Sequence, residues 1–238
     1  MTPSSQIPKT LILGILVCAA ASCSTSRSTP DDNDSTLWRL DRLDRAGSVP
    51  ARAEGNPTLV DTVHGPAIHF DGDEDRLLVE HNPLAEQNQF TIEVWFNPAD
   101  VWPANWEPRF FHIESLDNPD RRITVELRLN DQQQWYLDGF LKSERDALTL
   151  IDETLVHPVN QWHHAALTFD GTTMRTYVNG ALELEGTVDF EPIGTLARTS
   201  IGARLNRVHW FNGLMLAVRM TPRALEPEAF LDWEKLPD

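Results

Sequence analysis

Short runs in which apolar residues occupy every second position recur along this chain. In residues 90–96 the apolar positions are Phe90, Ile92, Val94 and Phe96, and residues 122–129, 163–169 and 174–178 repeat the pattern. Alternate side chains of a β-strand point to opposite faces, so a period of two predicts strands with one buried face. Turn signals separate the runs: Asp71-Gly72, Asn97-Pro98, Asp170-Gly171, Asn179-Gly180 and Asn212-Gly213. The pattern therefore predicts an all-β, antiparallel sandwich or barrel.

A single domain is expected, because the sequence from residue 37 onward contains no second linker and no internal repeat. The chain has 238 residues, of which 41% are hydrophobic, and this is enough for one ordinary core. We place the domain at residues 37–236, with a short C-terminal helix in the stretch from Pro222 to Trp233. The 20 basic and 36 acidic residues give a net charge of −16, which repels phosphate backbones. Nucleic acid is therefore not an expected partner.

Residues 1–36 carry the pattern of an export signal followed by a tether. Lys9 precedes an apolar run at residues 11–21, which has the length of a signal-peptide core and is short for a membrane span. The run ends in Ala-Ala-Ser-Cys, with the cysteine at position 23, and this ending resembles a bacterial lipobox. We expect a lipoprotein signal peptide at residues 1–22, a lipidated Cys23, and a flexible tether that completes residues 23–36. The alternative is an ordinary secretory signal cut nearby, with an incidental cysteine.

The lipobox interpretation predicts an exported lipoprotein, anchored to a membrane of the bacterial cell envelope. Ser24 follows the cysteine, which resembles outer-membrane lipoproteins of the enteric type and favours the outer membrane. The chain has only two cysteines, Cys18 and Cys23, and both precede the domain. The domain is therefore expected to lack disulfides, thiolate metal sites and cysteine nucleophiles.

Six short motifs in a fixed order carry a family resemblance over residues 37–230. They are Ala67–Gly72, Phe90–Trp95, Trp162–Gly171, Tyr177–Gly180, Ser200–Gly202 and Phe211–Gly213. Together they resemble a LamG-like domain of the concanavalin A-like lectin/glucanase superfamily. The resemblance implies a jelly roll of two antiparallel sheets, with a concave face on which relatives often hold glycans. It does not imply a function, because this fold hosts enzymes, lectins and adhesion modules.

An enzyme is not the expected class. Glycanases of the superfamily carry a Glu-x-Asp-x-Glu run on one strand, whereas Glu93 and Glu126 are followed at the second position by Trp95 and Arg128. The sequence has no Gly-x-Ser-x-Gly, no phosphate loop and no His-Glu-x-x-His. His163 and His164 could suggest a metal site or a base. Adjacent strand residues point to opposite faces, however, so the two side chains cannot easily chelate one ion. We predict no catalytic residues and no cofactor, and a glycoside hydrolase remains the less favoured alternative.

A structural metal ion is not expected either. Relatives often hold calcium with an aspartate on the last long strand, in a run such as Gly-x-Ile-Asp-x-Val. The matching run here is residues 213–218, and Leu216 occupies the position of the aspartate. The acidic loop at residues 71–75 could offer oxygen ligands, but the simpler interpretation is a solvated loop.

The polar positions of the alternating strands supply the ligand-binding candidates. If their strands are neighbours on the concave sheet, they form a mixed aromatic and charged surface of the kind that binds sugars. The candidates are Trp95, Glu126, Arg128, His164, Arg175 and Tyr177, with Trp102 and Trp106 of the following loop as a wall. The alternative is a self-satisfied network in which Glu93 and Glu126 pair with Arg128 and Arg175. The predicted function is a non-catalytic, lipid-anchored envelope domain that binds a carbohydrate or a protein, and the alternative is a structural envelope protein.

Overall fold

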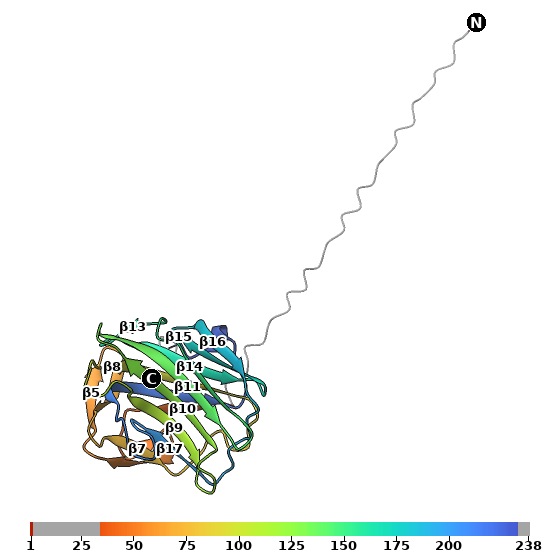
Figure 1. Ribbon diagram of the computed structural model, residues 1–238. Helices are drawn as coiled ribbons and strands as arrows, with labels where there is room; N and C mark the ends of the chain where they lie inside the picture. Colours follow the sequence, from red (N-terminus) through yellow and green to blue (C-terminus); the bar gives the residue numbers. More distant parts are fainter. Residues whose placement is uncertain (2–33, 233–238) are drawn as a thin grey trace. The chain divides into compact units, whose positions relative to one another are not determined.

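The computed structural model describes Met1 and residues 34–232, and the second range forms two antiparallel β-sheets that enclose one core (Figure 1). The first, here called the β8 sheet, has the spatial order β16 (Ala181–Thr187), β15 (Thr173–Val178), β14 (His163–Phe169), β8 (Phe90–Pro98), β18 (Asn212–Thr221), β6 (Gly65–Asp71) and β5 (Thr58–Thr62), with β1 (Thr36–Arg39) also paired to β18.

The second sheet, here called the β10 sheet, has the order β12 (Ala147–Ile151), β11 (Gln134–Lys142), β10 (Arg122–Leu129), β9 (Arg109–Ser115), β17 (Ala197–Ile201), β7 (Arg76–Val79) and β4 (Arg52–Glu54), with β13 (His157–Pro158) paired to β11. A small ribbon is formed by β2 (Arg45–Ala46) and β3 (Val49–Pro50). These two sheets confirm the predicted all-β, antiparallel jelly-roll sandwich.

The core lies between the sheets and is built from the alternating positions that the sequence indicated. The apolar positions of residues 90–96 are each at most 1% exposed, and the corresponding positions of β10, β14 and β15 are buried with them. Aromatic contacts join the two layers: the ring of Phe96 in β8 stacks on Phe110 of β9 at 4.7 Å and meets Trp135 of β11 at 5.1 Å. The intervening positions of these strands consequently face outward.

Two glycines show how the sequence shapes this sandwich. Asn179 and Gly180 link β15 to β16 with φ angles of 51° and 80°, the left-handed values that a two-residue hairpin turn requires. Gly139 in β11 faces the other sheet, where a Cβ atom would lie 2.7 Å from Thr176 Cγ2. The missing side chain lets the sheets approach closely, while Asp138 and Phe140 on either side point outward.

The chain after β18 is less helical than the sequence predicted. Its described part, residues 222–232, is here called the C-terminal segment, and it contains only a 3-10 turn at Pro227–Ala229. Pro222 and Pro227 lack the N–H groups that a longer helix uses. The carbonyl and N–H groups of several other residues instead bond to side chains of the β8 sheet, as described below.

The expected signal peptide and lipidated Cys23 lie outside the described residues, as does the tether up to residue 33. The first strand begins at Thr36, one residue before the expected start of the domain. In the described part of the chain, none of the helices combines the length and the apolar character that a membrane crossing needs.

Candidate binding site

The eight candidate residues divide between the two outer faces of the sandwich. Trp95, His164, Arg175 and Tyr177 lie on the outer face of the β8 sheet, here called the β8 face. Glu126 and Arg128 lie on the outer face of the β10 sheet, here called the β10 face, and Trp106 beside them in the β8–β9 loop, residues 99–108. Trp102 belongs to the same loop. The single surface expected from the sequence is not formed, because β8, β14 and β15 belong to one sheet and β10 to the other.

The C-terminal segment covers the centre of the β8 face. The N–H of Leu231 donates to Glu93 Oε1 at 2.5 Å, and Trp95 Nε1 donates to the carbonyl of Leu231 at 3.2 Å. Arg219 Nη2 donates to the carbonyl of Ala229 at 2.6 Å. Thr91 Oγ1 donates to the carbonyl of residue 223 and accepts the N–H of residue 225, both at 2.8 Å. Side chains of the sheet thus bind the backbone of the segment at four points.

Glu93 is fully buried beneath this cover and is surrounded by donors. Arg219 Nε lies 2.5 Å from Glu93 Oε2, and His164 Nε2 lies 3.0 Å from Oε1. Burial raises the pKa of Glu93, but the hydrogen bonds from His164 and Arg219 outweigh burial and hold that pKa below its ordinary value. The ring of Phe230 then packs against His164 at 5.6 Å and Tyr177 at 5.0 Å. His164 and Tyr177 are therefore closed off from an external ligand.

The two adjacent histidines occupy opposite faces of β14, as the strand geometry predicts. His163 points inward, where its ring contacts Phe96 and Trp135 and its Nε2 bonds to the carbonyl of Pro158 at 2.9 Å. His164 points outward to Glu93. The two imidazoles cannot chelate one ion, and both are occupied by the structure itself.

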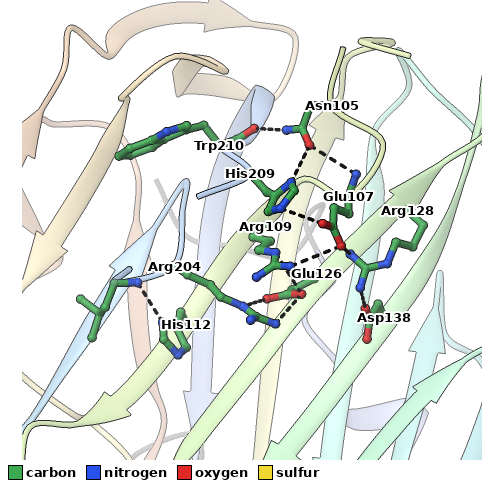
Figure 2. Close-up of polar contacts among 11 residues, drawn as sticks. Asn105, Glu107, Arg109, His112, Glu126, Arg128, Asp138, Arg204, His209 and Trp210 are labelled. Carbon is green, nitrogen blue, oxygen red and sulfur yellow. Dashed lines mark hydrogen bonds and ion pairs between the residues drawn. The ribbon is translucent and has the colours of Figure 1, made fainter. Parts of the chain in front are cut away.

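The β10 face carries a charge cluster whose side chains are 0–19% exposed, and in the part of the chain that the structure describes no terminal segment lies over it. The cluster consists of Glu107, Arg109, Glu126, Arg128, Asp138 and Arg204, and Figure 2 shows their side chains converging above β9, β10 and β11. Arg204 holds Glu126 through two hydrogen bonds, the second at 2.9 Å. Arg128 bridges Glu107 and Asp138 at 3.0 and 2.5 Å.

Strand register explains why these groups meet. Glu126 lies opposite Asp138 of β11, and Arg128 lies opposite Tyr136. On the other side of β10, a bulge between Val125 and Glu126 shifts the pairing with β9, so that Glu126 lies opposite Arg109. Burial raises the pKa of Glu126, although Arg204 and Arg109 act to lower it, and burial also raises the pKa of Asp138 against the effect of Arg128.

The β17–β18 loop, residues 202–211, closes one end of this face against the β8–β9 loop. Asn105 donates to the carbonyl of Trp210 at 2.8 Å, and its side-chain oxygen lies 3.4 Å from His209 Nδ1 (Figure 2). His209 Nε2 lies 2.7 Å from Glu107 Oε1. The two loops thereby fix Glu107, which in turn fixes Arg128.

His112 lies beside the cluster and has a defined tautomer. Its Nδ1 accepts the N–H of Leu205 at 3.0 Å, so a neutral ring carries its proton on Nε2. Burial lowers the pKa of His112 well below the ordinary value, and Arg204, Arg122 and Arg109 lower it further. His112 Nε2, Thr124 Oγ1 and Ser200 Oγ are buried without a hydrogen-bond partner in the structure. Such atoms are normally satisfied by ordered water or by a ligand.

Aromatic side chains surround the charge cluster. Trp106 is 49% exposed with the guanidinium of Arg128 5.6 Å from its ring centroid, and Trp102 is 43% exposed. Tyr136 and Phe140 are partly exposed on the outer side of β11, on either side of Asp138. Arg122 lies 5.3 Å from the ring of Phe140. Open aromatic surface and fixed polar groups therefore occur together on the β10 face.

The ion pairs differ from the network considered from the sequence. Glu93 pairs with Arg219 and His164, and Glu126 pairs with Arg204 and Arg109. Arg128 does not reach either glutamate in an ion pair; its partners are Glu107 and Asp138. Arg175 pairs with Asp170 and Glu185 at the rim of the β8 face. The sequence alternative of an internally paired network is thus correct in that both glutamates form ion pairs within the protein. It is wrong about which arginines they pair with.

Sequence reasoning missed most of the residues that build the β10 face. The missed residues are Glu107, Arg109, His112, Tyr136, Asp138, Phe140, Arg204 and His209. Residues 134–142 alternate with Trp135, Leu137 and Leu141 on the buried side, so the outward trio on β11 could have been found. The loop residues carry no such signal, because loop packing decides their position.

The charge cluster is not arranged for acid–base catalysis or for metal binding. Each of its three carboxyl groups is held by at least one guanidinium, so none is placed as a free general base. Across residues 34–232 there is no group of three or more His, Cys, Asp or Glu side chains with the geometry to hold a metal ion. The arrangement is suited to binding by hydrogen bonds and aromatic stacking.

The family follows from the sequence and agrees with this fold. A model described as the concanavalin A-like lectin/glucanases superfamily matches residues 71–229, which is more than half of the chain. The chain therefore belongs to that superfamily. No curated protein sequence has significant similarity to it.

Solved structures with the same fold include binding domains of larger proteins. Domain 4 of AbnA, a GH43 extracellular arabinanase from Geobacillus stearothermophilus, in complex with arabinotriose, has 21% identity and a TM-score of 0.54, covering 82% of this chain and 85% of that one. The binding domain of Paraclostridial Mosquitocidal Protein 1 has 14% identity and a TM-score of 0.63, covering 83% and 51%. The binding domain of botulinum neurotoxin DC, in complex with rat synaptotagmin II, has 17% identity and a TM-score of 0.57, covering 83% and 50%. The chain spans about half of each toxin domain, and these likenesses concern the fold.

Proposed function

We propose that this chain is a non-catalytic carbohydrate-binding domain, anchored to the bacterial cell envelope through Cys23, and that its ligand lies on the β10 face. The observation that carries the proposal is the difference in cover. The β10 face combines exposed Trp106 and partly exposed Tyr136 and Phe140 with fixed charged groups, whereas the C-terminal segment covers the centre of the β8 face. The arabinotriose complex of AbnA domain 4 supports a sugar on this fold.

A sugar fits the chemistry of this face in two ways. Its ring presents C–H groups that pack on aromatic rings, and Trp106 and Tyr136 lie on either side of Arg128. Its hydroxyls both donate and accept hydrogen bonds, and Arg128, whose side chain is 14% exposed and is held by the buried Asp138, offers a charged donor. The ion pairs between the carboxyl groups and the arginines support a binding role without catalysis.

A glycan array tests this proposal directly. The purified protein is expected to bind at least one polysaccharide class, and Trp106→Ala is expected to weaken that binding. Tyr177→Phe is the matched control, because it alters an aromatic side chain of the β8 face under Phe230. Absence of binding to every glycan, or loss of binding in Tyr177→Phe with retention in Trp106→Ala, would contradict the assignment.

The anchor is tested by fractionation of cells that express the protein. Cys23→Ala is expected to move the protein from the detergent-extracted membrane fraction to the soluble exported fraction, and Cys18→Ala is expected to leave it in the membrane. Separation of inner and outer membranes then tests the expectation from Ser24 that the outer membrane is the destination. A wild-type protein that is already soluble would contradict lipidation.

A protein partner is the second candidate, favoured by the edge strand β5. Leu59, Val60 and Val63 are exposed on or next to this strand, at one end of the β8 sheet. An exposed edge with apolar side chains is suited to pairing with a strand of another protein. A photo-crosslinking residue placed at position 60 in living cells is expected to give a discrete adduct if this candidate is correct.

A further inference from the structure

The charges of the β10 face are matched within the face itself. Arg128 lies 3.0 Å from Glu107 and 2.5 Å from Asp138, and Arg109 lies 3.3 Å from Glu107 and 3.7 Å from Glu126. Arg204 binds Glu126 through its Nε and Nη2 donors. The cluster therefore contains three guanidinium groups and three carboxyl groups, and no guanidinium is left without a carboxyl group at ion-pair distance.

The two histidines next to the cluster add no positive charge near neutral pH. Burial lowers the pKa of His209, and Arg109, Arg128 and Arg204 lower it further, while Glu107 acts in the opposite direction. Burial and the nearby arginines also lower the pKa of His112 well below the ordinary value. At the far end of the aromatic surface, the cations Arg122 and Lys142 both lie within ion-pair distance of Asp120, at 3.9 and 2.7 Å.

A charged ligand would therefore meet two obstacles. Within the cluster, an anionic group would have to displace a carboxyl group from an arginine that already holds it, because each of the three arginines has a carboxyl partner. It would also approach a protein whose net charge is −16, so its long-range interaction is repulsive. A neutral ligand avoids both costs, and its hydroxyls can share the donors and acceptors without breaking the pairs.

The aromatic positions also set a size. Tyr136 and Phe140 are four residues apart on one strand, and at about 3.4 Å per residue this separation is about 14 Å along β11. Trp106 extends the surface beyond Tyr136 on the side of β10, where its ring contacts Arg128. The surface is longer than one sugar ring and fits an extended chain.

We propose that the ligand of the β10 face is a neutral oligosaccharide of several sugar units, bound along β11 between Trp106 and Phe140. This inference rests on the proposed carbohydrate-binding function and specifies its ligand class. Stacking on the aromatic rings supplies contact area, and Arg128, held in place by the buried Asp138, binds the hydroxyl groups. The matched ion pairs act as a filter that disfavours uronate and sulfated glycans.

Calorimetry on the full-length protein separates the possible outcomes. The neutral probes are arabinan, galactan and (1→3)-β-glucan, and the anionic probes are polygalacturonate and chondroitin sulfate, each at low salt and at roughly 0.15 M salt. We expect a neutral probe to bind with an affinity that changes less than about twofold with salt, and anionic probes to bind at least about tenfold more weakly. Tightest binding of an anionic probe, weakened by salt, would overturn the neutral class and keep the carbohydrate function. If no probe binds, the proposed function fails as well.

A pair of variants tests the filter itself. Glu107→Gln leaves Arg109 without one carboxylate partner and Arg128 without one of its two. It is expected to raise polygalacturonate binding by several fold while the neutral probe still binds. Glu185→Gln makes the same change in net charge at the rim of the β8 face, where Glu185 pairs with Arg175, and is expected to leave both unchanged. Equal gains in the two variants would assign the effect to net charge and overturn the local filter.

Discussion

The two outer faces of this sandwich have the same central chemistry, but the C-terminal segment covers only the β8 face in the described part of the chain. Each has a fully buried glutamate at its middle, Glu93 in β8 and Glu126 in β10, and each glutamate is bound by an arginine. On the β8 face the remaining donors come from His164 and from the backbone of Leu231, and the chain closes over them. On the β10 face the surroundings are further ion pairs and exposed aromatic rings. A buried ion pair on a sheet of this fold is therefore not evidence of a binding site by itself. Whether the C-terminal segment packs over the face determines whether a ligand can reach it.

The largest loss of stability is expected when Glu93, at the centre of the β8 face, is replaced. Glu93→Ala removes the buried carboxylate that Arg219 and His164 bind and that accepts the N–H of Leu231. Breaking a buried pair from one side costs about 3–5 kcal/mol, so the free energy of unfolding is expected to fall by that amount. Denaturant titration measures the change. A loss below about 1 kcal/mol would show that the C-terminal segment is not held through Glu93.

The next largest loss of stability is expected from a substitution in the C-terminal segment that covers the β8 face. Leu231 is 6% exposed at the end of the described chain, and Leu231→Ala is expected to cost about 2 kcal/mol of unfolding free energy, at the low end for a buried leucine. Val208→Ala in the open β17–β18 loop is the control and is expected to cost less than about 0.5 kcal/mol. Similar losses in both would remove the distinction between a covered and an open face.

The fold could be predicted from the sequence because its determinants are local. Alternation fixes which residues of β8, β10, β14 and β15 face the core, and Asn179-Gly180 fixes a hairpin. The candidate site could be predicted only in part. Alternation shows that Trp95 and Arg128 both point outward, but it does not show which sheet each strand joins, because strand pairing depends on residues far apart in sequence. The cover of the β8 face was missed for the same reason, since its backbone contacts have no periodic signal.

Ligand binding is expected to respond on one face only. Arg128→Lys keeps the charge but loses the planar fork that bridges Glu107 and Asp138, and it is expected to weaken glycan binding by about 1–3 kcal/mol. Tyr177→Phe is expected to leave the dissociation constant unchanged, because Tyr177 lies under Phe230. Calorimetry with the neutral probe measures both. A larger effect of Tyr177→Phe would reverse the roles of the two faces.

The two buried glutamates are expected to change the acid stability in opposite directions. The pKa of Glu93 is below the ordinary 4.5 in the folded protein, so its contribution is present above that pH and is lost on acidification. Burial raises the pKa of Glu126 above 4.5, so its contribution is present at low pH and is lost as the pH rises. Glu93→Gln should therefore make the loss of stability below neutral pH shallower, and Glu126→Gln should make it steeper. Unfolding titrations across the acidic range test the two signs.

The smallest effect is expected from removal of divalent cations. Asp75, the most buried acid of the loop at residues 71–75, is 1% exposed and already accepts the N–H groups of Asn56 and Asp71 at 2.6 and 3.0 Å. Burial raises its pKa, which is the opposite of what an ion-binding carboxylate needs. Leu216, where relatives often have an aspartate, is buried at a bulge of β18. We therefore expect a chelator to leave the melting temperature unchanged. An ion bound only to the folded state at one hundred times its dissociation constant would add about 2.7 kcal/mol. A clear drop in melting temperature that calcium restores would therefore place Asp75 in a metal site and not in a turn.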